Sequence, residues 1–450
     1  MVASAPAHPV RDHCLAPARP VDAPIAPIEG RYGRLFPQLE PLGGDDEVLL
    51  ALGAPGGLCD ATGRDEPEGA EPAGWPFFGQ FLAHDITADR SPIGPQADPA
   101  AIANFRAPRI NLECVYGAGP VGAPFLYDRD DAAKLLVGDD DVPRNAQGIA
   151  LLGDPRNDVH RFISQLHVGM LRAHNLLVDR LREDGVDEAD CFDSARRALM
   201  WHVQWVIVEE FLPGLVGRAL VDELLDAGRR CYRPEGSPFI PFEFADAAFR
   251  YGHGQIRDAY RLNDRADGLA VFPDLVGFGP LPREHVIDWP LLFGPRAQRA
   301  KRMDGRLAPS LINLPVAITG SVAVEAYHSL AARDLQRGAA IGLPSGEAIA
   351  RAMGVEPLAT AETGLAAHGW RDETPLWLYV QLEADARGDG SRLGPVGGRI
   401  VAEVLLGLLD ADPESYRAND PSWSPTLPVA GERFSLLDLL TTAAGPAAAR

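Results

Sequence analysis

The chain has 450 residues, 46% of them apolar, and a formal net charge of -21 at pH 7. Such an acidic chain repels phosphate backbones and anionic lipid surfaces, which argues against nucleic acid as a partner. Its five cysteines are odd in number and form no C-x-x-C pair, so neither a disulfide framework nor a zinc site is indicated.

Residues 1–30 contain proline too often for a helix and lack the continuous apolar run of a secretory signal peptide. We therefore predict an extended or disordered N-terminal arm, 1–30, and a cytoplasmic protein. Apolar stretches elsewhere are shorter than the roughly 20 residues that span a bilayer, so no membrane span is expected. No repeat or composition break divides residues 31–450, which predicts one large domain.

Helical spacing of apolar residues dominates this domain, and alternating strand patterns are scarce. The first predicted helix, 77–86, follows a Gly/Pro-rich loop, and the second, 158–183, has Asn157 or Asp158 as its expected N-cap. Further helices are predicted over 192–216, 244–260, 321–337 and 398–409. The expected fold is mainly α, with very little β.

Two predicted helices each carry a histidine in apolar surroundings. In "FFGQFLAHDI", Gln80 and His84 share one helix face, whereas Asp85 lies about 100° around the helix from His84. In "AAFRYGHGQIRDAYRL", His253 lies in a buried stripe, and Arg250 precedes it by about one turn. Taken singly, each histidine is more often a buried core residue with hydrogen-bonded ring nitrogens than a catalyst or metal ligand.

The order of several motifs is more specific than either histidine. "GQFLAHDI", "VYGAGP", "DPRND", "LRAHN", "EEFLPGLVG" and "FRYGHGQI" are followed by "LQRGAAIGLPSG", "ETPLWLYVQLEA" and "RLGPVGGRIVAEVLLGLL". Over roughly residues 70–440, the chain resembles the animal-type, cyclooxygenase-like haem peroxidases, and the later motifs resemble their bacterial branch. The resemblance implies a large helical haem peroxidase domain.

On the distal side of the haem, the resemblance implies that His84 moves a proton between the two oxygens of hydrogen peroxide. Arg156, in "DPRND", would stabilise the negative charge that develops as the O–O bond breaks to leave a ferryl iron and a porphyrin radical. Gln80 would orient water or a small anion over the pocket.

On the proximal side, the resemblance implies that His253 ligates the haem iron. Its second ring nitrogen then needs a hydrogen-bond acceptor, for which we predict Asn313. Arg250 resembles the arginine that pairs with a haem propionate.

Three positions depart from the family pattern. Ala83 and Val159 stand where mammalian members carry the carboxylates that esterify the haem, and His160 stands where one member forms a thioether link. Since ester bonds need carboxylates, we predict non-covalent haem b.

A calcium site is left open by the sequence. Asp85 matches a family calcium ligand, and Asn111, Glu113 and the carbonyl of Arg109 could complete the site, but Ala107 replaces a usual hydroxyl ligand. An altered calcium site and a lost one are equally compatible with these residues.

The leading function is a peroxidase that uses hydrogen peroxide to oxidise a small organic donor, such as a phenol; halide oxidation is less favoured. The alternatives are a fatty-acid dioxygenase of the same superfamily and a non-catalytic haem-binding protein. Arg250 argues against the dioxygenase, because cyclooxygenase relatives place a radical-forming tyrosine three residues before the proximal histidine.

The remaining histidines His167, His174 and His202 are interpreted as packing residues. Neither the physiological donor nor the oligomeric state follows from the sequence.

Overall fold

The computed structural model describes residues 30–88 and 102–442. The predicted arm therefore lies outside the described residues, except for Gly30, which begins the first strand. The mainly α prediction is confirmed. The α-helices of seven or more residues are α1 (Asp46–Gly53), α2 (Trp75–Ile86), α5 (Arg161–Glu183), α6 (Glu188–Val206), α8 (Arg218–Ala227), α12 (Leu330–Ala340), α13 (Gly346–Met353), α15 (Leu376–Gly388), α16 (Pro395–Ala411) and α18 (Leu436–Thr442).

Shorter helical segments connect these helices. The α-helical ones are α3 (Glu113–Tyr116), α4 (Gly119–Gly122), α7 (Leu212–Val216), α9 (Phe242–Ala245), α10 (Pro309–Ile312), α11 (Val316–Thr319), α14 (Thr360–Thr363) and α17 (Tyr416–Asn419). A π-helical segment, η4 (Ile207–Phe211), joins α6 to α7. The 3-10 segments are η2 (Pro124–Leu126), η3 (Pro155–Asp158), η5 (Ala248–Gln255), η6 (Arg283–His285), η7 (Trp289–Leu291), η8 (Glu325–His328) and η9 (Leu365–His368).

The strands of the described residues are short and form three small sheets. Their bounds are β1 (Gly30–Gly33), β2 (Glu68–Pro72), β3 (Ala103–Asn104), β4 (Ile240–Pro241), β5 (Ala259–Tyr260), β6 (Leu269–Ala270) and β7 (Arg299–Lys301). β1 pairs antiparallel with β3 and parallel with β4, and the other two sheets are the antiparallel pairs β2–β7 and β5–β6.

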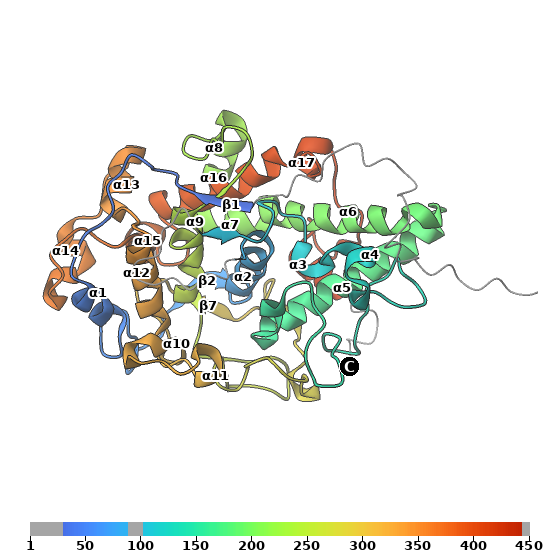
Figure 1. Cartoon of the computed structure of the whole chain (residues 1–450), viewed down its shortest axis with the longest axis horizontal. Coiled ribbons are helices and arrows are strands. Elements are labelled where there is room, and N and C mark those ends of the chain that lie inside the picture. The colour runs from blue at the N-terminus through green and yellow to red at the C-terminus, as the bar shows by residue number, and fades with distance from the viewer. Residues whose placement is uncertain (1–29, 89–101, 443–450) are drawn as a thin grey trace, which may run out of the picture.

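Helix α2 lies at the centre of the molecule, between α5 and α6 on one side and α12 and α15 on the other (Figure 1). It packs directly against α5, η3 and η5. Pro76 occupies the first turn, where a missing N–H costs nothing, and the apolar residues Phe78, Phe81 and Leu82 are fully buried. This central helix therefore has a rigid apolar environment.

Three sequence predictions about local structure are wrong. The helix predicted over 321–337 is divided into η8 and the start of α12, with non-helical residues before and between them. The N-cap of α5 is His160, whose side chain accepts a hydrogen bond from the N–H of Phe162, because Asn157 and Asp158 belong to η3. The helix predicted over 244–260 is divided into α9, η5 and β5. The 3-10 segment crosses α15 closely: a Cβ on Gly254 would lie 2.1 Å from Oε1 of Gln381.

Within the described ranges, no helix combines the length and apolar character that crossing a bilayer requires. Cys59, Cys114, Cys191 and Cys231 are free thiols in these same ranges.

Candidate functional site

The imidazole of His84 lies near the C-terminal end of α2 and is 8% exposed. Its Nδ1 is 2.8 Å from Oδ1 of Asn157 in η3. Since an amide oxygen only accepts hydrogen bonds, Nδ1 carries the proton and Nε2 keeps its lone pair. The pKa of His84 is lowered to about 4, first by burial and then by the charge of Arg156. The hydrogen bond with Asn157 raises the pKa, but by less than Arg156 lowers it. His84 is therefore a neutral base at ordinary pH.

The Asn157 amide holds two imidazoles at once. Its Nδ2 is 3.0 Å from Nδ1 of His167 in α5, and Asn157 has no solvent exposure. With its oxygen toward His84, the amide donates to His167 and fixes the tautomer of both rings. The sequence interpretation of His167 as a packing residue therefore omitted its link to His84 through Asn157.

Arg156 lies beside His84, as the resemblance implied. Its Nη2 donates to the carbonyl oxygen of His84 at 3.0 Å and to that of Thr87 at 2.5 Å, and its Nε donates to Oδ1 of Asp154 at 3.0 Å. These bonds fasten the guanidinium to carbonyls at the end of α2. Its Nη1 has no hydrogen bond within the described ranges, so two N–H donors remain for a ligand.

The carboxylate of Asp154 is the common partner behind Arg156. Burial alone would raise the pKa of Asp154, but the hydrogen bonds and charges of Arg156 and Arg106 outweigh burial and hold it well below its usual range. Asp154 is therefore an anion at ordinary pH that fixes the guanidinium of Arg156.

His253 lies in η5 and is held by a carboxylate. Its Nδ1 is 2.5 Å from Oδ2 of Asp334 in α12, and Asp334 is 1% exposed. The prediction of Asn313 as this partner is wrong: Asn313 is exposed, and its Nδ2 donates to the carbonyl of Pro309 at 3.3 Å. The acceptor for Nδ1 of His253 comes instead from the apolar face of α12.

Arg250 contacts the same carboxylate. Its Nη1 donates to Oδ1 of Asp334 at 3.1 Å, its Nη2 approaches Asp246 at 3.4 Å, and its Nε donates to the carbonyl of Ala245. Arg337 also pairs with Asp246, so two guanidiniums face two buried carboxylates next to His253. Each terminal nitrogen of Arg250 keeps a second N–H, and the propionate role stays a prediction.

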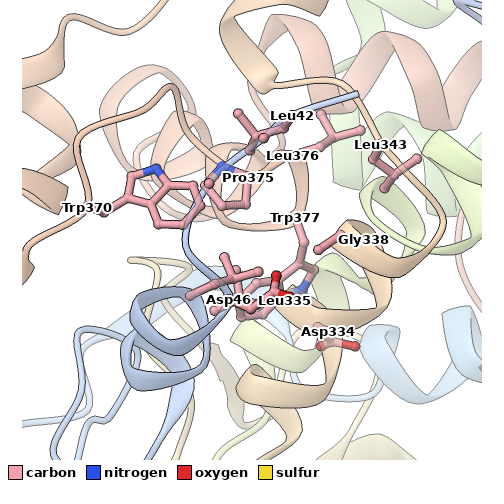
Figure 2. A pocket seen from close by; sticks show the side chains of 14 residues that line it. Leu42, Asp46, Asp334, Leu335, Gly338, Leu343, Trp370, Pro375, Leu376 and Trp377 are labelled. Carbon is pink, nitrogen blue, oxygen red and sulfur yellow. The ribbon is translucent and has the colours of Figure 1, made fainter. Parts of the chain in front are cut away.

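A cavity of about 120 Å³ lies on the other side of Asp334. Figure 2 shows it between Asp334, Leu335 and Gly338 of α12 and the aromatic side chains of Trp370 and Trp377. Trp377 also donates from its indole nitrogen to the carbonyl of Arg250 at 3.4 Å. Asp334 thus lines this cavity and also contacts the ring of His253.

The two imidazoles offer the donor atoms that a haem site needs. His84 and His253 are each anchored through Nδ1, and neither Nε2 has a hydrogen bond within the described parts of the chain. The side chain of His253 is 28% exposed. α2 and η5 pack together at their glycines, where a Cβ on Gly252 would lie 3.3 Å from Pro76. One imidazole is thus prepared as an iron ligand and the other as a base.

The residues predicted to bind calcium do not form a set of free oxygen ligands. Both oxygens of Asp85 accept backbone N–H groups, Glu113 pairs with Arg106, and Arg109 pairs with Asp412. Among the residues that the structure describes, no group of three His, Cys, Asp or Glu side chains could hold a metal ion. Calcium does not fit these residues as they are arranged.

Two further side chains, Gln80 and Tyr251, lie on or beside α2. Gln80 is half-buried one turn before His84, and its role stays a prediction. Tyr251 is fully buried, and its hydroxyl lies 3.3 Å from the position of a Cβ on Gly79 in α2.

Sequence reasoning missed Asp334, Asn157 as the partner of His84, and Asp154. A signal existed for Asp334, because it shares a helix face with Ala331 and Leu335, where a lone acid would be buried. For Asn157 the only local signal was its place beside Arg156.

The family model for animal haem peroxidases matches residues 123–367, which is more than half of the chain. This range includes Arg156, His253 and Asp334. Heme peroxidase 2 of Caenorhabditis elegans is 23% identical over 288 residues, which cover 59% of this chain and 40% of that protein. Peroxidasin of Drosophila melanogaster is 24% identical over 314 residues, which cover 63% of this chain and 19% of that protein. The chain therefore spans less than half the length of these curated relatives.

Solved structures show the same fold. Peroxidase A from Dictyostelium discoideum superposes with a TM-score of 0.65 at 14% identity and covers 92% of this chain and 93% of its own. A fatty acid alpha-dioxygenase from Oryza sativa has a TM-score of 0.63 at 15% identity, covering 93% and 79%. The fold is therefore shared by a peroxidase and a dioxygenase. With the match of the family model, these findings show that the chain belongs to the animal haem peroxidase family.

Proposed function

We propose that this protein is a peroxidase that binds haem b non-covalently and uses hydrogen peroxide to oxidise a small organic donor. One observation carries the proposal: two imidazoles on the packed elements α2 and η5 are each fixed through Nδ1 and keep Nε2 free. A protein that only stored haem would have no need for a desolvated, neutral base beside a fixed arginine.

His253 would hold the haem iron through Nε2, with Arg250 available to a propionate. When bound, haem would supply the redox chemistry, drawing two oxidising equivalents from hydrogen peroxide and passing them singly to the donor. Ala83 and Val159 offer no carboxylate for an ester bond, which supports non-covalent binding.

The chain's own residues would manage the proton and the charge. Nε2 of His84 takes a proton from one oxygen of the peroxide and returns it to the other, which leaves as water. The free N–H groups on Nη1 of Arg156 stabilise the negative charge on the departing oxygen. Asn157 keeps the proton of His84 on Nδ1, so that Nε2 is the atom that works as the base.

Stopped-flow spectra of the haem-loaded protein test the proposal. Mixing with hydrogen peroxide should shift the Soret band of the wild type within milliseconds, and a phenol should restore it. His84→Ala should lose this reaction by about 100- to 10,000-fold, the range for a positioned acid–base group. His368→Ala, a change at an exposed histidine, serves as the control. An unchanged rate in His84→Ala would remove this residue from the mechanism. Oxygen uptake with an unsaturated fatty acid in the absence of peroxide would favour a dioxygenase.

A further inference from the structure

The carboxylate of Asp85 is fully buried and surrounded by hydrogen-bond donors. Its Oδ2 accepts from the N–H groups of Leu112 at 2.8 Å and Asn111 at 3.1 Å, and its Oδ1 accepts from that of Cys114 at 3.0 Å. These N–H hydrogens point at both oxygens, where a cation would otherwise sit. Asp85 therefore closes the turn that leads into α3 and is not directed at a metal ion.

The other expected oxygen ligands are also engaged. Oδ1 of Asn111 accepts from the N–H of Glu113 at 3.1 Å, and Oε1 of Glu113 accepts from Nη1 of Arg106 at 2.8 Å. A calcium ion needs six to eight oxygen ligands that converge on one point. These oxygens converge on N–H groups instead.

A positive charge is nevertheless present here, and the chain itself supplies it. The side chain of Arg106 is 9% exposed, and its Nη2 donates to Oδ2 of Asp154 at 2.6 Å and to the carbonyl of Gly153 at 3.1 Å. Its Nη1 donates to Glu113. One guanidinium thus joins the segment after Asn104 to the loop that precedes Arg156.

The geometry points to Arg106 as a built-in cation that takes the structural place of the calcium ion implied by the family resemblance. An arginine suits this place because its charge is permanent and its planar fork satisfies several oxygens at fixed angles. Oδ2 of Asp154 accepts from both Arg106 and Arg156, at 2.6 and 2.8 Å. Two arginines, Arg106 and Arg156, therefore meet at Asp154 in this loop, and we expect the chain to fold without calcium.

The test uses the purified full-length chain and needs no catalytic readout, so its outcome is separate from that of the proposed peroxidase activity. The metal content is measured after dialysis against calcium chloride, and thermal unfolding midpoints are compared in millimolar calcium chloride and in EDTA. We expect no stoichiometric calcium and the same midpoint in both solutions. One tightly bound calcium per chain, or a midpoint that falls in EDTA, would overturn the inference.

Substitutions at Arg106 provide a second test of the inference. Arg106→Met keeps the apolar stem and removes the charge, so its midpoint should fall by several degrees, and Arg106→Lys should recover part of the loss. Arg399→Met is the matched control, since Arg399 also bridges two acidic side chains, Glu223 of α8 and Glu403 of its own helix α16. An Arg106→Met midpoint equal to that of the wild type would contradict the proposed role. If Arg106→Met does not fold, Arg106→Lys and the EDTA comparison still decide the question.

Discussion

Oδ2 of Asp334 lies 2.5 Å from Nδ1 of His253, while Oδ1 of the same buried carboxylate accepts from Arg250. A carboxylate is a stronger acceptor than an amide, so this pair increases electron density on the ring nitrogen that faces the haem site. Arg250 holds the carboxylate in place.

This relationship predicts the behaviour of Asp334→Asn. The substitution keeps the size of the side chain and removes its charge, so the haem iron should become easier to reduce. Haem affinity or turnover should fall by about 10- to 100-fold, as for other residues that support a metal ligand. Spectroelectrochemistry and haem titration measure the two effects.

The control for Asp334→Asn is Asp389→Asn, the same chemical change at a side chain that is 92% exposed. The reduction potential and haem affinity of this variant should match the wild type. Equal potentials in Asp334→Asn and the wild type would show that the carboxylate has no influence on the site.

The sequence predicts the helical frame well because local periodicity determines it. The predicted helix 77–86 lies within α2, and 398–409 lies within α16, since both segments have apolar residues on nearly every face. His84 and Arg156 are 72 residues apart, and only the ordered motifs of the family indicated that they meet.

The remaining details depend on contacts that periodicity does not encode. Asp334 contacts His253, which is 81 residues away in the sequence, and no motif in α12 indicates this hydrogen bond. The close crossing of Gly254 with Gln381 turns the predicted proximal helix into a 3-10 segment. The sequence left the calcium site open, because it shows the chemistry of Asp85 and Asn111 but not which backbone N–H groups their oxygens accept.

Asn157→Leu should impair the peroxide reaction. It leaves Nδ1 of both His84 and His167 without the amide, so the tautomer of the base is no longer fixed. The peroxide rate should fall by roughly 10- to 100-fold, and the loss of two buried hydrogen bonds should cost about 1–3 kcal/mol of unfolding free energy. Stopped-flow spectra and urea denaturation measure these changes.

Asn175→Leu is the matched control for Asn157→Leu. The amide of Asn175 holds the backbone of Leu135 through two hydrogen bonds at 2.8 Å, away from the distal residues. This variant should lose stability to a similar extent but keep the peroxide rate. A comparable rate loss in both variants would mean that Asn157 acts only through stability.

The pH profile of the reaction with hydrogen peroxide should have its acid limb at an unusually low pH. His84 is the base in its neutral form, and burial lowers its pKa to about 4, below the ordinary value of 6.5. The rate should therefore stay constant down to about pH 5 and fall through about pH 4, where the imidazole gains a proton. An acid limb centred near pH 6.5 would contradict a desolvated His84.

The same limb should respond to the charge of Arg156. This charge lowers the pKa of His84, so Arg156→Met should move the limb to higher pH, toward 6.5. Arg156→Lys keeps a positive charge and should leave the limb closer to the wild-type position. Rate profiles of the haem-loaded variants, measured with hydrogen peroxide alone, separate this shift from effects on the donor.

Gly338→Ala should stabilise the protein. Gly338 lies in α12 on the wall of the cavity beside Asp334, and a Cβ there would meet only Leu343, at the ordinary contact distance of 3.5 Å. Alanine in a helix is favoured over glycine by about 0.5–1 kcal/mol, because the unfolded chain loses less freedom. Gly354→Ala provides the opposite case: a Cβ on Gly354 would also have open space, but its φ of +71° at the end of α13 disfavours a side chain by about 1–2 kcal/mol. The urea midpoint should therefore rise in Gly338→Ala and fall in Gly354→Ala, and a fall in both would show that α12 cannot accept a methyl group in this cavity.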